Sequence, residues 1–183
     1  MVTFKPRQEK LLSGNLVISN AVEEDAEDLM RFKEKVHHQT KYLRRRPEEL
    51  DLSPEKERQL IEDANQSDSK FLIVARYKED IVGYLSFQTS PYRRYSHQGE
   101  LRMSVDKDCW GKGIGSYLLK FLIDWGANND LRRIELLVGE HNNRAVNLYR
   151  KFGFKEEGRL KDRRRLVEED EYEDELIMAY IYR

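Results

Sequence analysis

The 183-residue sequence contains a single cysteine, Cys109, which excludes an internal disulfide and agrees with a reducing compartment. It also lacks any apolar run that approaches the ~20 residues of a membrane-spanning helix. The first residues show no apolar segment of the kind found in signal peptides. These absences predict a cytoplasmic protein that has no membrane partner.

Neither sign of charge dominates the chain. Its 33 basic and 34 acidic residues leave a net charge of -1, which gives no general attraction to nucleic acid or anionic membranes. The clusters Arg44–Arg46 and Arg163–Arg165 lack an aromatic-basic binding motif, so we expect no nucleic-acid partner. The chain also lacks repeats and any linker rich in proline, glycine or serine. Its length suits one sizeable core, and we predict a polar N-terminal arm over residues 1–15 and one domain over 16–183.

Hydrophobic periodicity predicts a mixed α+β fold of about seven strands and about four helices. The strand, helix and strand between residues 99 and 138 form a crossover unit, which favours parallel pairing of the two strands. Segments 37–51 and 161–174 carry clustered charges without apolar periodicity and are predicted to be connections. The predicted strands cover residues 16–19, 71–75, 81–87, 99–105, 132–138, 154–160 and 175–182, and the predicted helices cover 21–36, 53–64, 113–125 and 143–152.

Three glycines lie between a predicted strand and an amphipathic helix. Gly111, Gly113 and Gly115 remove side chains where the backbone turns and where a ligand can approach it. The first turn of the following helix has unpaired N–H groups and the positive end of the helix dipole, which together form a cradle for phosphate or pyrophosphate. The spacing matches neither the dinucleotide-binding fingerprint nor the P-loop, because Ser116 replaces the third glycine and Lys112 precedes a glycine. A tight turn without a ligand is the alternative interpretation.

The stretch from Trp110 to Gly115 resembles motif A of the GNAT superfamily of acetyl-CoA-dependent N-acetyltransferases, Arg/Gln-x-x-Gly-x-Gly/Ala. Trp110 stands where Arg or Gln is usual. A second stretch, Asn142-x-x-Ala145-x-x-x-Tyr149-x-x-x-Gly153-Phe154, is similar to a further segment of that family. The order of predicted elements is also the GNAT order, and parts of the chain look like small bacterial GNAT proteins of the general type. The resemblance implies one GNAT-fold domain with a central, mixed, mostly antiparallel twisted sheet.

The resemblance also implies acetyl-CoA (coenzyme A) as cofactor and implies no metal. Backbone N–H groups of the glycine turn would take the pyrophosphate, and the strand before it would present its backbone to the pantetheine arm. Asn142 resembles a cofactor-contacting asparagine of the family, although by itself it is equally a helix cap. The implied cofactor-binding residues are Met103, Ser104, Val105, Trp110, Gly111, Lys112, Gly113, Ile114, Gly115, Ser116, Asn142, Ala145 and Tyr149.

Two residues are candidates for proton transfer. Tyr149 matches the family tyrosine near the cofactor sulfur and would protonate the departing thiolate, since a phenol with a reference pKa of about 10 keeps its proton at neutral pH. The alternative is a core aromatic residue. Glu100 begins the strand before the turn and is the candidate base, with a solvated edge residue or a water-mediated reaction as alternatives. His97 is a weaker candidate, and Cys109 is not expected to carry the acetyl group.

The acceptor is open to several interpretations. In the family, segments corresponding to 37–51 and 161–174 frame the acceptor, and acidic residues there would suit a cationic amine, unless opposite charges within the hairpin satisfy one another. We predict direct transfer to a primary amine of a small molecule, such as an amino acid, a polyamine or an aminoglycoside-like compound. The alternatives are a protein N-terminus or lysine as acceptor, and a non-catalytic acyl-CoA sensor or interaction module. Small proteins of this fold often dimerise, so a homodimer is a further expectation.

Overall fold

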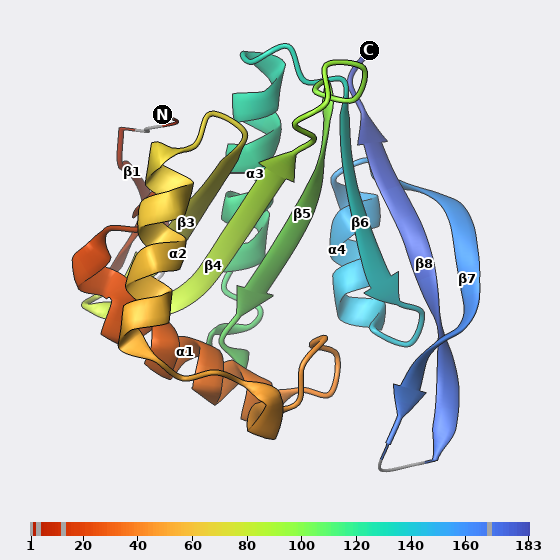
Figure 1. Ribbon diagram of the computed structural model, residues 1–183, viewed down its shortest axis with the longest axis horizontal. Coiled ribbons are helices and arrows are strands. Elements are labelled where there is room, and N and C mark those ends of the chain that lie inside the picture. The colour runs from red at the N-terminus through yellow and green to blue at the C-terminus, as the bar shows by residue number, and fades with distance from the viewer. Residues whose placement is uncertain (1, 3–4, 12–13, 168–169) are drawn as a thin grey trace. The chain divides into compact units, whose positions relative to one another are not determined.

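The structure is a computed structural model that describes residues 2, 5–11, 14–167 and 170–183 (Figure 1). Parts of the predicted N-terminal arm (residues 1, 3–4 and 12–13) and Glu168 and Glu169 of the charged segment lie outside these described residues. The chain forms two compact units. The first unit contains residues up to 88 and 102–118, and the second contains 89–101 and 119–183.

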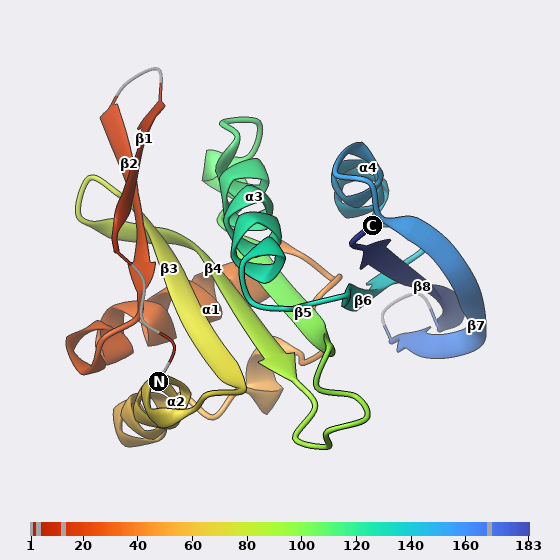
Figure 2. The same cartoon turned by 90° about the horizontal axis from the view of Figure 1, so that it is seen from above.

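The first unit is built on an antiparallel sheet of β1 (Arg7–Leu11), β2 (Gly14–Asn20), β3 (Lys70–Tyr77) and β4 (Asp80–Thr89), in that order. Helices α1 (Ala26–Gln39) and α2 (Pro54–Gln66) lie together on one face of this sheet (Figures 1 and 2). Apolar residues at helical spacing on α1 and α2 meet alternate residues of β3, which closes the core. This core contains Ala21, Ala26, Leu29, Phe32, Val36, Ile61, Ala64, Leu72, Val74 and Ile81.

The helix α3 (Ile114–Ala127) starts in the first unit and packs closely on β4 there. Gly83 of β4 makes this approach possible, because an added Cβ would stand 3.3 Å from the side chains of both Ile114 and Leu118. The same Cβ would stand 3.3 Å from the carbonyl oxygen of Ser104 in β5 (Gln98–Val105). Gly83 thereby allows the start of α3 and the end of β5 to pack against the same strand. The glycine turn connects these two elements.

The second unit contains residues 98–101 of β5, followed in strand order by β6 (Arg133–Gly139), β8 (Glu171–Ile181) and β7 (Lys155–Leu166). β5 runs parallel to β6, with Gln98 opposite Arg133, so the predicted parallel crossover is confirmed. β8 pairs antiparallel with both β6 and β7. Helix α4 (Asn143–Lys151) connects β6 to β7, and its Val146 and Tyr149 are buried.

The mixed α+β class is confirmed, and within the described residues there are four α helices and eight strands, more than the predicted seven or so. The additional strand, β1, lies in the segment predicted to be an arm. The predicted connection 161–174 is wrong for most of its length, because β7 and β8 extend through it to Leu166 and from Glu171. Helix α1 begins at Ala26 rather than residue 21, after a 3₁₀ turn in which Asp25 accepts a hydrogen bond from the Val22 N–H. No helix in the described part of the chain is long and apolar enough to span a membrane.

Candidate functional site

The glycine turn adopts a backbone conformation that selects for glycine. Gly111 and Gly113 have φ angles of 77° and 87°, in the left-handed region that side chains with a Cβ rarely adopt. A Cβ added to Gly111 would meet no atom within 4 Å, so this side of the turn is open. Tyr117 N–H donates the first helical hydrogen bond, to the Gly113 carbonyl. The N–H groups of the three residues between them begin α3 and lack intrahelical acceptors, as at any helix N-terminus. The predicted pyrophosphate cradle therefore fits the observed backbone.

A buried carboxylate holds the entrance to this turn. Asp106 follows β5 and is 6% exposed. Its oxygens accept hydrogen bonds from Lys35 Nζ (2.7 Å), Gln39 Nε2 (2.9 Å) and Asp108 N–H (3.0 Å). Gln39 also accepts from the Lys107 N–H at 2.9 Å. Burial acts to raise the pKa of Asp106, but the hydrogen bonds from Lys35 and Gln39 outweigh it and leave the pKa below its usual range. The last turn of α1 is thus joined to the start of the glycine turn, which sequence spacing did not indicate.

Trp110, the departure from the family motif, has a structural role. Its indole Nε1 donates a 2.8 Å hydrogen bond to the carbonyl of Val105, at the end of β5. The neighbouring Lys112 Nζ donates to the carbonyl of Asp108 at 3.0 Å. Both side chains therefore hydrogen-bond to backbone carbonyls that precede the glycines. The Val105 carbonyl, which the sequence resemblance offers to the pantetheine arm, already accepts this indole hydrogen bond.

The Cys109 thiol is 8% exposed beside this turn. Burial raises its pKa, although Lys112, with Nζ 4.0 Å from the sulfur, opposes the rise. A thiol with a raised pKa is a poor nucleophile at neutral pH. Among the residues that the structure describes, no three His, Cys, Asp or Glu side chains gather in a way that could hold a metal ion.

A half-buried polar cluster lies beside the strand before the turn, and sequence reading missed it. Tyr84 is half-buried, and this burial raises the pKa of its phenol, while a hydrogen bond with Ser104 opposes the rise. Lys33 Nζ lies 5.5 Å from the centre of the Tyr84 ring and pairs with the buried Glu57 of α2. The four residues come from α1, α2, β4 and β5. Their sequence separation of up to 71 positions explains why no motif revealed them.

The candidate base lies on β5. Glu100 is exposed between the buried residues Gly99 and Leu101, and its register partner on β6 is Glu135. Its orientation, which the sequence left open, is therefore away from the face that Leu101 occupies. Of the other implied residues on this strand, Met103, Ser104 and Val105 are half-buried. The weaker candidate His97 is exposed, and its carbonyl accepts hydrogen bonds from the N–H groups of Arg132 and Arg133.

Helix α4 carries the second group of predicted residues. Asn142, Ala145 and Tyr149 follow one side of the helix at spacings of three and four. Asn142 caps the helix, since its Oδ1 accepts from the Ala145 N–H at 3.3 Å. Tyr149 packs against Phe154 with ring centres 5.6 Å apart, and burial raises the pKa of its phenol to about 12. The phenol therefore keeps its proton throughout the neutral range.

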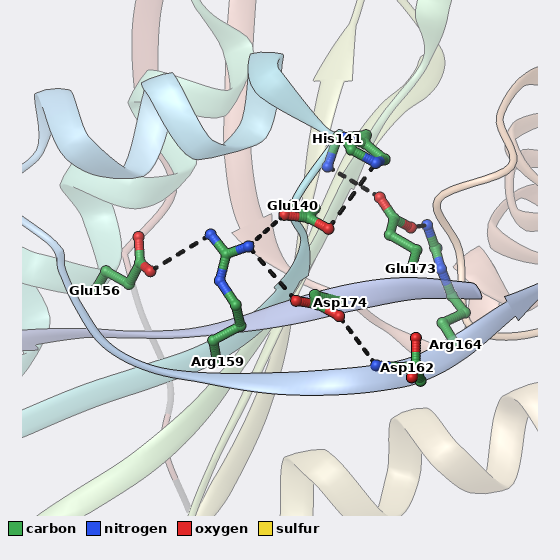
Figure 3. A network of polar contacts seen from close by, with 8 residues as sticks. All are labelled: Glu140, His141, Glu156, Arg159, Asp162, Arg164, Glu173 and Asp174. Atoms are coloured by element: carbon green, nitrogen blue, oxygen red, sulfur yellow. Dashed lines mark hydrogen bonds and ion pairs between the residues drawn. The ribbon is translucent and has the colours of Figure 1, made fainter.

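Among the described residues, arginines of the charged hairpin pair with nearby carboxylates, which agrees with one of the two sequence interpretations (Figure 3). Arg159 contacts Glu140 at 2.6 Å and Asp174 at 3.5 Å. Arg164 pairs with Glu173, Arg165 with Asp170 and Arg163 with Glu175. These carboxylates consequently offer little unbalanced charge to a cationic ligand.

The segment between α1 and α2 differs from the hairpin. Arg46 contacts Glu48 at 2.9 Å, and its N–H donates to Glu49. Arg44 and Arg45 are exposed and form no ion pair within the described ranges. Two positive charges on this segment are thus available to solvent.

The structure distributes the predicted site residues between the two units. The glycine turn and residues 103–105 of β5 belong to the first unit, whereas Glu100 and the α4 residues Asn142, Ala145 and Tyr149 belong to the second. Within the first unit, β5 and the cradle are brought together by Gly83 and by the Asp106 hydrogen bonds. Within the second, the α4 residues share one helix side.

Comparisons with known proteins identify the family of the chain. Residues 36–154 match the acetyltransferase (GNAT) family. The L-amino acid N-acetyltransferase AaaT of Escherichia coli is 33% identical over 111 residues, which are 60% of this chain and 67% of that protein. YwnH of Bacillus subtilis is 31% identical over 97 residues, 52% of this chain and 60% of that protein, so the match spans less than two thirds of YwnH.

A solved structure extends the likeness to nearly the whole chain. The crystal structure of an acetyltransferase of the GNAT family from Streptococcus pneumoniae has a TM-score of 0.86 and 29% sequence identity, covering 91% of this chain and 99% of that one. The family match includes both motifs on which the sequence resemblance rested, and the predicted GNAT fold is confirmed. The chain therefore belongs to the acetyltransferase (GNAT) family of N-acetyltransferases.

Proposed function

We propose that this protein transfers the acetyl group of acetyl-CoA directly to the primary amine of a small molecule, with an amino acid as the preferred class. The glycine turn carries the proposal. Its two left-handed glycines open the backbone at the N-terminus of a helix, which is the arrangement that binds a pyrophosphate. The backbone of β5 beside it supplies further polar groups for the pantetheine arm.

The proposed reaction forms a C–N bond and breaks the C–S bond of the thioester. Acetyl-CoA supplies an acyl group whose leaving thiolate needs a proton. We assign that proton to Tyr149, because burial holds its pKa near 12 and no other described group hydrogen-bonds its hydroxyl. The proton lost by the amine needs an acceptor, which we assign to Glu100 directly or through water.

The base role of Glu100 has its own test. Glu100→Gln keeps the shape of the side chain and removes its basicity, so the rate at neutral pH should fall. Glu135→Gln, on the register partner, is the matched control. A wild-type rate in Glu100→Gln would assign the base to water or another group.

The charges favour an acceptor that carries an anionic group. The hairpin carboxylates that would attract a polyamine are paired with arginines, whereas Arg44 and Arg45 of the 37–51 segment are exposed. By the family resemblance, this segment frames the acceptor. A carboxylate on the acceptor would complement its arginines. AaaT, named as acting on L-amino acids, is in keeping with this choice.

The test measures acetyl-CoA binding by calorimetry and then thiol release with four acceptors: L-amino acids, the matching amino-acid amides, spermine and peptides. We expect saturable binding, and turnover that is about tenfold better for the acid than for its amide, since one charge-assisted hydrogen bond is worth ~1.5–3 kcal/mol. Arg45→Ala should reduce that preference, with Arg58→Ala on α2 as a surface control. Binding without release on the whole panel would favour an acyl-CoA sensor, and release with peptides alone would favour a protein acetyltransferase.

A further inference from the structure

Glu173 of β8 is the most deeply buried charged side chain among the described residues, at 1% exposure. Its Oε1 accepts a 2.9 Å hydrogen bond from the backbone N–H of His141, and its Oε2 pairs with Arg164 (Figure 3). His141 belongs to the turn between β6 and α4. A side chain of the hairpin therefore holds the backbone immediately before Asn142, the cap of α4.

The backbone around this turn makes room for the carboxylate. A Cβ added to Gly139 would stand 2.8 Å from Glu173 Oε2 and 2.9 Å from Arg164 Nη2. Only glycine at this position leaves space for the ion pair. The Gly139 carbonyl accepts from the Asn142 N–H at 3.0 Å, so the residue that admits Glu173 also closes the turn.

A second attachment lies beside the first. The Glu140 N–H donates to the Asp174 carbonyl at 3.0 Å, and Arg159 joins the side chains of Glu140 and Asp174. The turn is therefore attached to β8 at two successive residues, Glu140 and His141. In Figure 3 these contacts converge from the hairpin on the turn that leads into α4.

A bulge in β7 brings Arg164 opposite Glu173. Leu160 pairs with Glu175 and Arg164 with Glu173, so three residues of β7 face one residue of β8. This bulge contains Asp162, with φ of 49°, whose N–H donates to Asp174 Oδ1 at 3.0 Å. Without the bulge, the pairing register of β7 against β8 would not place Arg164 opposite Glu173.

A buried ion pair is a weak source of stability, because desolvation offsets most of its attraction. The feature that an apolar pair of the same size cannot supply is the acceptor for the His141 N–H. We propose that Glu173 is a positioning residue: it holds the 139–142 turn so that Asn142 binds acetyl-CoA. This inference rests on the proposed function. The body of α4 has its own buried contacts through Val146 and Tyr149, so the effect is confined to the turn.

Two matched double variants isolate the hydrogen bond. Arg164→Met with Glu173→Gln removes both charges but keeps an oxygen that can accept from His141. Arg164→Met with Glu173→Met removes the acceptor as well, and both pairs avoid an unpaired buried charge that would unfold the protein. Glu171→Gln, an exposed residue on the same strand, is the control for surface charge.

We expect the Met/Met variant to have a KM for acetyl-CoA about tenfold higher than that of the Met/Gln variant, with kcat within twofold, because a lost ground-state contact acts on binding. The His141 amide should also exchange its hydrogen faster in Met/Met, as measured by NMR. Met/Gln and Glu171→Gln should stay near wild type in both measurements. Equal KM values and equal His141 exchange in the two folded double variants would overturn the positioning role. Failure of the wild-type protein to bind acetyl-CoA would instead overturn the proposed function, whatever the exchange rates show.

Discussion

At the scale of single residues, the proton-transfer role of Tyr149 can be tested separately from cofactor binding. Burial disfavours the charged phenolate and raises the pKa to about 12, so the hydroxyl keeps its proton at every pH where the enzyme is expected to work. Tyr149→Phe removes that proton and keeps the ring that packs on Phe154. We expect kcat to fall about 100-fold, within the range for a lost general acid, while the Kd for acetyl-CoA changes much less.

Steady-state thiol release and calorimetry together check this prediction. Tyr180→Phe is the matched control, since Tyr180 also packs on Phe154, with ring centres 5.7 Å apart. Because the phenol pKa is raised, Tyr149 should cause no loss of wild-type rate between neutral pH and pH of about 10. An alkaline limb in that range that disappears in Tyr149→Phe would contradict the raised pKa, and an unchanged kcat would remove the acid role.

The thiol of Cys109 lies beside the proposed cradle but is suited to packing rather than acyl transfer. Since burial raises its pKa, the thiolate fraction at neutral pH is lower than in an unfolded chain. We expect modification by a disulfide reagent to be roughly tenfold slower in the folded protein than in denaturant. Cys109→Ala should keep kcat within twofold. Mass spectrometry that found an acetylated Cys109 after incubation with acetyl-CoA alone would refute direct transfer.

At the scale of elements, the connection between α1 and the glycine turn is the feature with the clearest consequence. Asp106→Asn keeps the shape of the side chain and loses its charge-assisted bond to Lys35. Lys35 is half-exposed, so we expect a loss of only about 1 kcal/mol in unfolding free energy at neutral pH. The KM for acetyl-CoA should also rise several-fold, because the backbone leading into the glycine turn is then held less firmly.

The pH dependence of that loss has a definite sign. The folded-state pKa of Asp106 is lowered, so its stabilisation is present above the unfolded value of about 3.9 and disappears as the pH falls through the folded value. Urea titrations should therefore show a constant difference between wild type and Asp106→Asn from neutral pH down to about 5, and a shrinking one in stronger acid. Asp108→Asn, which removes the exposed partner of Lys35, is the control and should change stability by less than about 0.5 kcal/mol. A difference that grew in acid would contradict the lowered pKa.

Elements with a strong local pattern were predictable, and those held by charge were not. The glycine turn, α3, α4 and the parallel strand pair follow from glycine placement and from apolar residues at helical or alternating spacing. The outer half of the β7–β8 hairpin has no such alternation, since residues such as Arg164 and Glu173 pair across strands rather than with a core. Sequence reading therefore predicted a connection there. The start of α1 was misplaced for a similar reason, because the Val22 N–H donates to the Asp25 carboxylate in a 3₁₀ turn that precedes the helix.

The same distinction applies to the residues of the candidate site. The cradle and Tyr149 lie in contiguous motifs, which can be recognised from the residues alone. Lys35, Gln39 and Asp106 are up to 71 positions apart, and Glu173 meets His141 across 32 positions. Contacts of this kind have no periodicity and no fixed spacing, so only the folded chain reveals them.

At the scale of the whole molecule, cofactor binding must raise the stability of the folded protein. A ligand that binds only the folded state stabilises it by about 2.7 kcal/mol at 100 times its Kd. For a chain of this size, that corresponds to a rise in Tm of about 5–10 °C, which a thermal-shift titration with acetyl-CoA measures. Coenzyme A should produce a similar rise, since the pyrophosphate and pantetheine arm are common to both.

Two variants at one position decide whether the glycine turn is responsible. Gly113→Ala and Gly113→Glu both place a side chain at a φ of 87°, so both carry a backbone strain of about 1–2 kcal/mol and a lower starting Tm. Only the glutamate adds bulk and negative charge at the proposed pyrophosphate site. We therefore expect Ala to keep part of the acetyl-CoA-dependent rise and Glu to lose it entirely. An equal rise in Gly113→Glu and wild type would mean that acetyl-CoA binds elsewhere, because a carboxylate in an occupied pyrophosphate cradle must repel the phosphates.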